Sequence, residues 1–133
     1  MGNEIKYIEL KNEKFPMVFS LNVIEAIQTE FGSLNDWKEL IEPKDGGETN
    51  LKALLFAFKE AINEGIDIEN ENLHGNRNFI TERKAGRIIT ELGLSEAGNQ
   101  LKEIVVSSTK GEDTSNDGKS DEEIKNVMTT QNQ

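Results

Sequence analysis

Few side chains in this 133-residue chain have the type and spacing that catalysis or metal binding requires. His74 is the single histidine and stands in the polar stretch 72–76, with no second histidine for a metal site and no serine nucleophile motif beside it. The chain has no cysteine, which excludes disulfides, thiolate metal sites and a cysteine nucleophile. We therefore expect His74 to be a surface-loop residue and the protein not to be an enzyme.

Asp67, Glu69 and Glu71 have the alternating acids of a calcium-binding loop. Such a loop also needs a glycine at its sixth position and a bidentate glutamate at its end. Asn72 stands in place of the glycine and Asn78 in place of the glutamate. The sequence therefore predicts no calcium site in this segment.

A second stretch with calcium-loop register lies near the C-terminus and contains Asp113, Ser115, Asp117, Gly118 and Asp121. Ile124 occupies the position of the closing glutamate, so calcium binding is not expected there either. Residues 118–120 read Gly-Lys-Ser, like the end of a phosphate-binding loop, but Asp113 replaces the first glycine and no predicted strand precedes it. We predict no metal and no cofactor.

The composition is acidic, with 15 Lys+Arg against 25 Asp+Glu and a formal net charge of −10. Nucleic-acid binding through phosphate contacts needs clustered basic residues, so DNA and RNA are not expected partners. No apolar run approaches the roughly 20 residues that span a bilayer, and the N-terminus is polar. These features predict a soluble, cytoplasmic protein without a membrane partner.

The N-terminal segment has the pattern of a β-hairpin. Residues 4–10 and 15–19 are rich in β-branched and aromatic side chains and flank the polar stretch 11–14. Pro16 favours an edge position for the second strand. Because a lone hairpin is marginally stable in water, we expect this one to lie on helices, gain another strand or pair with a second molecule. The last alternative predicts a homo-oligomer.

Capping residues and apolar periodicity predict four or five helices after the hairpin. The expected helices run from a Ser20 cap to Phe31 before Gly32, from a Ser33 cap to a stop at Pro43, from Asn50 to Glu64 before Gly65, from a Thr81 cap to Gly93, and from a Ser95 cap through Val105. Residues 66–79 are expected to form a polar connection.

The sharpest change in composition lies near Val106. Residues 107–133 contain only Ile124, Val127 and Met128 as sizeable apolar side chains, too few to offset the entropy of ordering. We predict a globular domain over residues 1–106 and a flexible acidic tail over 107–133, with at most a transient helical turn at 121–128. The expected fold is mainly α (α+β), with an N-terminal β-hairpin packed on a bundle of four to five helices and a disordered acidic C-terminal tail.

Phe56 departs from the pattern of the central helix. Leu54, Leu55 and Phe58 lie on the apolar arc of the expected helix, whereas Phe56 projects among charged residues. One interpretation is a second packing layer, for example against the hairpin. The other is an aromatic anchor that binds a partner protein.

The chain resembles a known family over residues 7–94. The segments that carry the resemblance are YIELKNEKFPMVFSLNVIEAIQTEFGSLNDW, LLFAFKEAINEGIDIENEN and ITERKAGRIITELGL, in this order and spacing. They are similar to the tail assembly chaperones of long-tailed (siphovirus-type) bacteriophages and of prophages of Gram-positive bacteria.

The resemblance implies a helper that coats the helical tape-measure protein, recruits subunits of the major tail tube protein and is absent from the finished virion. It implies no catalytic residues. A small acidic protein with spare apolar surface fits this role, since it can cover apolar helical stripes while its charge keeps the complex soluble. The alternative that the residues leave open is a small phage or prophage regulatory module that binds another protein.

Overall fold

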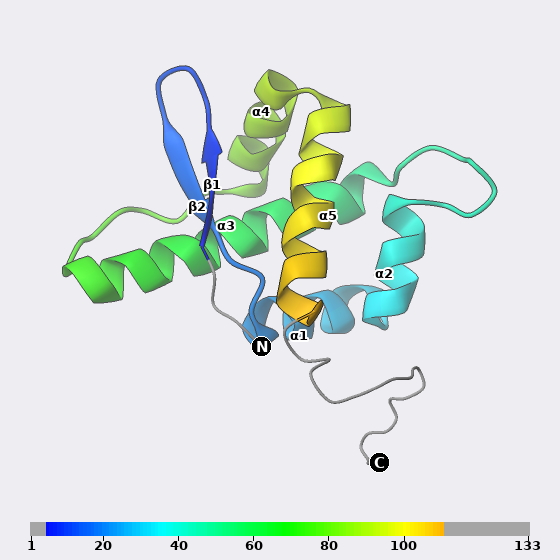
Figure 1. Cartoon of the computed structure of the whole chain (residues 1–133), viewed down its shortest axis with the longest axis horizontal. Helices are drawn as coiled ribbons and strands as arrows, with labels where there is room; N and C mark the ends of the chain where they lie inside the picture. The colour runs from blue at the N-terminus through cyan, green and yellow to red at the C-terminus, as the bar shows by residue number, and fades with distance from the viewer. Residues whose placement is uncertain (1–4, 111–133) are drawn as a thin grey trace, which may run out of the picture.

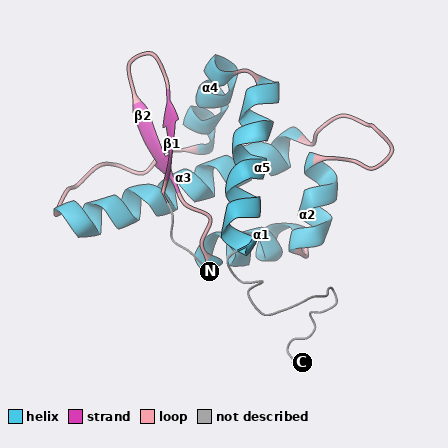
Figure 2. Cartoon of the chain, in the orientation of Figure 1, coloured by secondary structure: helices cyan, strands magenta, loops and turns pink. Residues whose placement is uncertain are grey.

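The structure is a computed structural model that describes residues 5–110 (Figure 1). Its elements are β1 (Lys6–Glu9), β2 (Lys14–Met17), α1 (Leu21–Phe31), α2 (Leu34–Ile41), α3 (Leu51–Leu73), α4 (Glu82–Leu92) and α5 (Leu94–Lys110). Figure 2 shows that helices dominate the described chain and that β1 and β2 form an N-terminal hairpin. The expected mainly helical fold with an N-terminal hairpin is confirmed.

The hairpin lies on the helices, which is the first of the three alternatives that its marginal stability left open. β1 and β2 pair antiparallel, with Ile8 opposite Phe15. The backbone N–H of Val18, just after β2, donates a 3.0 Å hydrogen bond to the carbonyl oxygen of Ala61 in α3. Phe15, Met17 and Phe19, which were expected on one face, are all buried, and Val18 between them is buried as well, so both faces of this segment are covered. β2 is thus held between β1 and the middle of α3.

The expectation that the central helix stops before Gly65 is wrong. α3 continues through Gly65 to Leu73 and is 23 residues long. A Cβ atom at Gly65 would lie 2.6 Å from the carbonyl oxygen of Pro16 and 3.0 Å from the backbone nitrogen of Met17. The glycine is therefore needed because the backbone of β2 crosses the helix at this point, not because the helix ends there.

Two asparagines on α3 hold the chain that returns toward α4. Asn63 bonds to the backbone of Ile80 in both directions, at 3.0 Å through its amide nitrogen and at 2.7 Å through its amide oxygen. Asn70 makes the equivalent pair of 3.0 Å bonds with the backbone of Arg77. The two asparagines stand about two helical turns apart on α3. Their side chains supply hydrogen-bond partners that the backbone of this irregular segment would otherwise lack.

The remaining helix limits follow their caps, with one exception. The side chains of Ser20, Ser33, Asn50 and Thr81 each accept a backbone N–H of the first helical turn, as caps of α1 to α4. The expected Ser95 cap is wrong, since α5 begins at Leu94 and the carbonyl oxygen of Gly93 already accepts the backbone N–H of Ala97. Gly93, at φ 95°, ends α4 and leads directly into α5.

Helix α5 also extends beyond the expected domain limit at residue 106. It continues to Lys110, so the first residues assigned to the tail by composition are helical. Residues 111–133, including the predicted turn at 121–128, lie outside the described residues.

The core is formed where α3 meets the hairpin and the other helices. Phe19 and Phe58 are its largest fully buried side chains, and the rings of Phe19 and Trp37 lie 6.1 Å apart. The indole N–H of Trp37 donates a 3.1 Å hydrogen bond to the carbonyl oxygen of Ala53, which ties α2 to the first turn of α3. α5 adds Ala97, Leu101 and Ile104 to the same cluster.

Candidate partner-binding groove

An open apolar groove lies between α2 and α5 and has a volume of about 710 Å³. Figure 1 shows α5 crossing in front of α3, with α2 to its right. The groove is lined by Trp37, Lys38, Ile41, Glu42, Thr49, Leu54, Leu94, Ser95, Gly98, Asn99, Leu101, Lys102, Val105 and Val106. Its size falls within the range of roughly 300–1,000 Å³ that is common for ligand sites.

The floor and the rim of the groove differ in exposure. Trp37, Leu54 and Leu101 are at most 2% exposed and form the floor. Leu94 and Val106 on α5 are 51% and 52% exposed and form part of the rim. A surface with a packed apolar floor and exposed apolar rim residues is typical of a site that receives apolar side chains from a partner.

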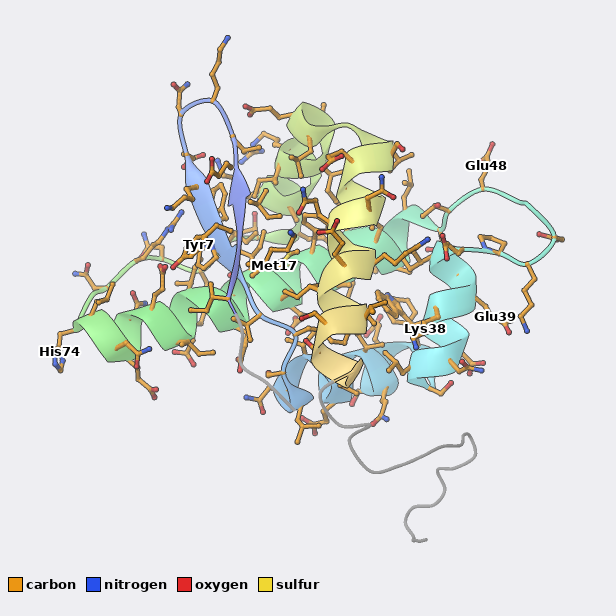
Figure 3. All side chains as sticks on the ribbon, in the orientation of Figure 1. Tyr7, Met17, Lys38, Glu39, Glu48 and His74 are labelled. Carbon is orange, nitrogen blue, oxygen red and sulfur yellow. The ribbon has the colours of Figure 1, made fainter. Side chains whose placement is uncertain are left out.

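The charged groups of the groove stand at its edges. Lys102 of α5 forms an ion pair with Glu42, the residue that follows α2. Both side chains are more than half exposed, so this pair contributes at most about 1 kcal/mol and opens at little cost. Lys38 makes no ion pair within the described residues, and Figure 3 shows it on a different side of α2 from Glu39. Among residues 5–110, the groove therefore offers one lysine without an ion pair beside its apolar floor.

Gly98 leaves the wall of the groove open. A Cβ atom added at Gly98 would have no neighbour within 4 Å among the described residues, and Gly98 has an ordinary backbone conformation in the middle of α5. It stands four residues after Leu94 and three before Leu101, on the same face of the helix. A Cβ atom at this position would stand in open space beside the groove lining, so a larger side chain has room to enter the groove.

The sequence patterns did not identify this groove. On a helical wheel of α5, Leu94, Leu101 and Val105 fall within a narrow arc, whereas Val106 lies about 100° from Val105, so the apolar residues cover a broader arc than one packing face needs. That breadth was the available signal. The depth of the groove, however, depends on the separation of α2 and α5, which no local pattern determines.

The structure separates the residues that first suggested chemistry. Asp67, Glu69 and Glu71 belong to α3 and not to a loop, which corrects the expected connection at 66–79. His74 is exposed and ends α3 with a left-handed backbone, φ 54° and ψ 38°, a conformation in which histidine is enriched. Within residues 5–110, no three His, Asp or Glu side chains are grouped closely enough to hold a metal ion. The two motifs at 113–124 lie outside the described residues.

Phe56 is half-buried and lies away from the groove. Its ring meets the ring of Phe31 edge to face, with 5.4 Å between the centroids, and the ammonium group of Lys59 lies 5.3 Å from its centre. Phe56 thus contacts Phe31 of α1, and both residues pack against the core cluster. Partner binding by Phe56 stays a prediction.

Tyr7 forms a polar contact between the hairpin and the far half of α3. Its hydroxyl group donates a 2.6 Å hydrogen bond to the carboxylate of Glu69. This hydrogen bond, followed by burial and by the charge of Glu69, raises the pKa of Tyr7 above its ordinary value of 10.0. The contact exists because α3 continues past Gly65, and it fixes β1 to the extension of the helix.

We expect the absorbance of Tyr7, the single tyrosine, to titrate above the ordinary midpoint of about pH 10 in the native protein. Glu69→Gln should lower the midpoint toward that value, because it removes the negative charge that opposes phenolate formation. Since the folded-state pKa is raised, the stabilising contribution is present below about pH 10 and is lost as the pH rises through the folded-state pKa.

Glu71→Gln is the matched control, since it removes the same charge from an exposed position two residues away. It should leave the Tyr7 midpoint nearly unchanged. Equal midpoints in the wild-type and Glu69→Gln proteins would show that the hydrogen bond does not control this ionisation.

None of the helices described between residues 5 and 110 is both long and apolar enough to cross a membrane. No protein-family model, no curated protein and no solved structure matches this chain.

Proposed function

We propose that this protein is a tail assembly chaperone of a long-tailed bacteriophage or prophage, which acts in the cytoplasm of the bacterial host. In this proposal it binds apolar helical segments of the tape-measure protein, recruits subunits of the tail tube and leaves before the virion is complete. The groove between α2 and α5 is the observation that carries the proposal, and the resemblance over residues 7–94 supplies the partner.

The shape of the groove suits one face of an amphipathic helix. Its walls are two helices, its floor is apolar, and its rim keeps Leu94 and Val106 exposed. A helix bound in such a groove places side chains spaced three and four residues apart against the floor. A tape-measure protein presents many such stripes along one chain, so weak contacts repeated along it give high avidity and still allow stepwise release.

The charge of the protein supports the same role. With a formal net charge of −10, copies bound along one tape-measure chain repel other complexes and oppose aggregation of the apolar stripes. The groove itself carries Lys38 and the Lys102–Glu42 pair at its edges. Apolar contacts thus supply binding, while the outer surface keeps the complex in solution.

The position of the gene distinguishes this proposal from a regulatory protein-binding module. A gene between that of a major tail protein and an unusually long tape-measure gene supports the chaperone. A gene within a cluster of regulators, with no tape-measure gene near it, contradicts it.

Gly98→Phe should block the groove and abolish the chaperone function without unfolding the protein. The added ring would enter open space between α2 and α5 and compete with partner side chains for the apolar floor. We expect the affinity for the tape-measure protein of the same genome to fall by a factor of about ten or more, the effect of losing a central anchor. The measurement is co-expression with the tape-measure protein, followed by its soluble yield and by titration of purified segments.

Gly98→Ala is the matched control. It adds only a methyl group that meets no atom within 4 Å, and it should leave binding and soluble yield unchanged. Failure of the wild-type protein to bind any tape-measure segment would reject the chaperone function. Equal binding by wild type and Gly98→Phe would keep the function but reject the groove as its site.

A further inference from the structure

The groove has a second candidate occupant within the same chain. We propose that residues 121–128 dock in the groove between α2 and α5 when no partner is bound there, and that a partner must displace them. The inference rests on the groove to which the proposed function assigns the tape-measure protein, and it adds regulation of that site. Three observations carry it: the distribution of apolar residues after α5, the charges at the groove, and the distance that the linking residues must span.

The apolar residues after α5 have helical spacing. Ile124, Val127 and Met128 are the only sizeable apolar side chains in residues 111–133. Positions i, i+3 and i+4 share one face of a helix, which is the pattern that helix-in-groove recognition uses. The groove presents a complementary apolar floor, formed by Trp37, Leu54 and Leu101. The segment is thus a short version of the ligand that the groove fits.

The charges of the segment complement those at the edge of the groove. Asp121, Glu122 and Glu123 precede the apolar stripe, and in a helix they occupy the first turn, where the helix dipole favours acidic side chains. Lys38 lines the groove and makes no ion pair within residues 5–110. An acidic first turn can form an ion pair with Lys38, whereas a basic segment would be repelled.

The linking residues are long enough for docking in the same molecule. α5 forms one wall of the groove and ends at Lys110, and the ten residues 111–120 separate it from the segment. From Gly98 to Lys110 the helix rises about 18 Å, whereas ten extended residues reach up to about 35 Å. A short flexible link gives an effective concentration on the order of millimolar. A segment with only millimolar intrinsic affinity would therefore fill about half of the grooves.

The absence of cysteine allows a direct test in the full-length chain. Thr129→Cys creates a single attachment site for a nitroxide spin label beside the segment. We expect loss of the amide NMR signals of Gly98, Asn99 and Lys102 in the labelled protein, and their recovery when the label is reduced. Signals of His74 and Gly75, beyond the end of α3 that lies far from the groove, should persist, since about 30 Å of helix separates His74 from Leu54 in the groove floor.

Ile124→Asp combined with Val127→Asp should restore the groove signals, because charged side chains cannot occupy the apolar floor. The matched control adds the same two charges on the side of the helix opposite the stripe, through Asn126→Asp and Gln133→Asp, and should keep the signal loss. Gly98→Phe should release the segment as well, measured on Asn99 and Lys102.

Each outcome decides between occupants. Groove signals that survive in the labelled wild-type chain overturn the proposal. In a mixture of spin-labelled chains without isotope enrichment and isotope-enriched chains without the spin label, docking within one molecule leaves the groove signals intact. Loss of the groove signals in this mixture assigns the groove to a second copy and overturns docking within one molecule. No tape-measure protein is present in this experiment, so its failure leaves the proposed function standing. Conversely, docking of the segment would persist if the tape-measure protein proved not to bind.

Discussion

Gly65→Ala should destabilise the protein by about 1–3 kcal/mol or more, the range for inserting a methyl group into space that is already filled. The new Cβ atom would lie 2.6 Å from the carbonyl oxygen of Pro16, and this neighbour is backbone that cannot rotate away. Relief requires β2 to move off α3, which would break the hydrogen bond from Val18 to Ala61. The measurement is urea unfolding followed by circular dichroism.

Helix propensity alone predicts the opposite sign. A glycine inside a helix costs about 0.5–1 kcal/mol relative to alanine, so alanine should stabilise α3 if no neighbour opposed it. Gly98→Ala, in α5, tests this gain in helix stability directly, because among the described residues no atom lies within 4 Å of the added methyl group. We expect Gly98→Ala to raise the free energy of unfolding by up to about 1 kcal/mol. A Gly65→Ala protein as stable as wild type would contradict the close crossing of β2.

The two glycines show where sequence patterns succeed and where they fail. The local sequence identifies the caps Ser20, Ser33 and Thr81, because a helix cap involves only the next few residues. Gly65 was read as a helix end by the same local logic. Its actual role depends on Pro16, 49 positions earlier in the sequence, and no local pattern contains that contact.

The candidate site was hidden for a related physical reason. The sequence predicted that α2 and the last helix exist and bury one face each, but not how far apart they lie. A groove is a property of that separation, and it depends on side chains such as Trp37 that fill the floor from below. Phe56 stands among charges on a helical wheel, yet in the folded chain its ring packs edge to face against Phe31 of α1.

Phe58→Ala should produce the largest loss of stability, about 3–5 kcal/mol, as expected for truncating a fully buried aromatic ring. Phe58 is 0% exposed and belongs to the core cluster of α3 and the hairpin. Phe56→Ala should cost less, about 1–2 kcal/mol, because its ring is half-buried and loses mainly the edge-to-face contact with Phe31. Chemical unfolding of both variants gives the comparison.

The same pair separates packing from partner binding at Phe56. If the ring serves only as a second packing layer, Phe56→Ala should bind tape-measure segments as tightly as wild type under conditions where both are folded. A loss of affinity of about tenfold, with the fold retained, would restore the interpretation as an anchor residue. An unfolding midpoint that falls as far as that of Phe58→Ala would place Phe56 in the core, and it would contradict the partial burial against Phe31.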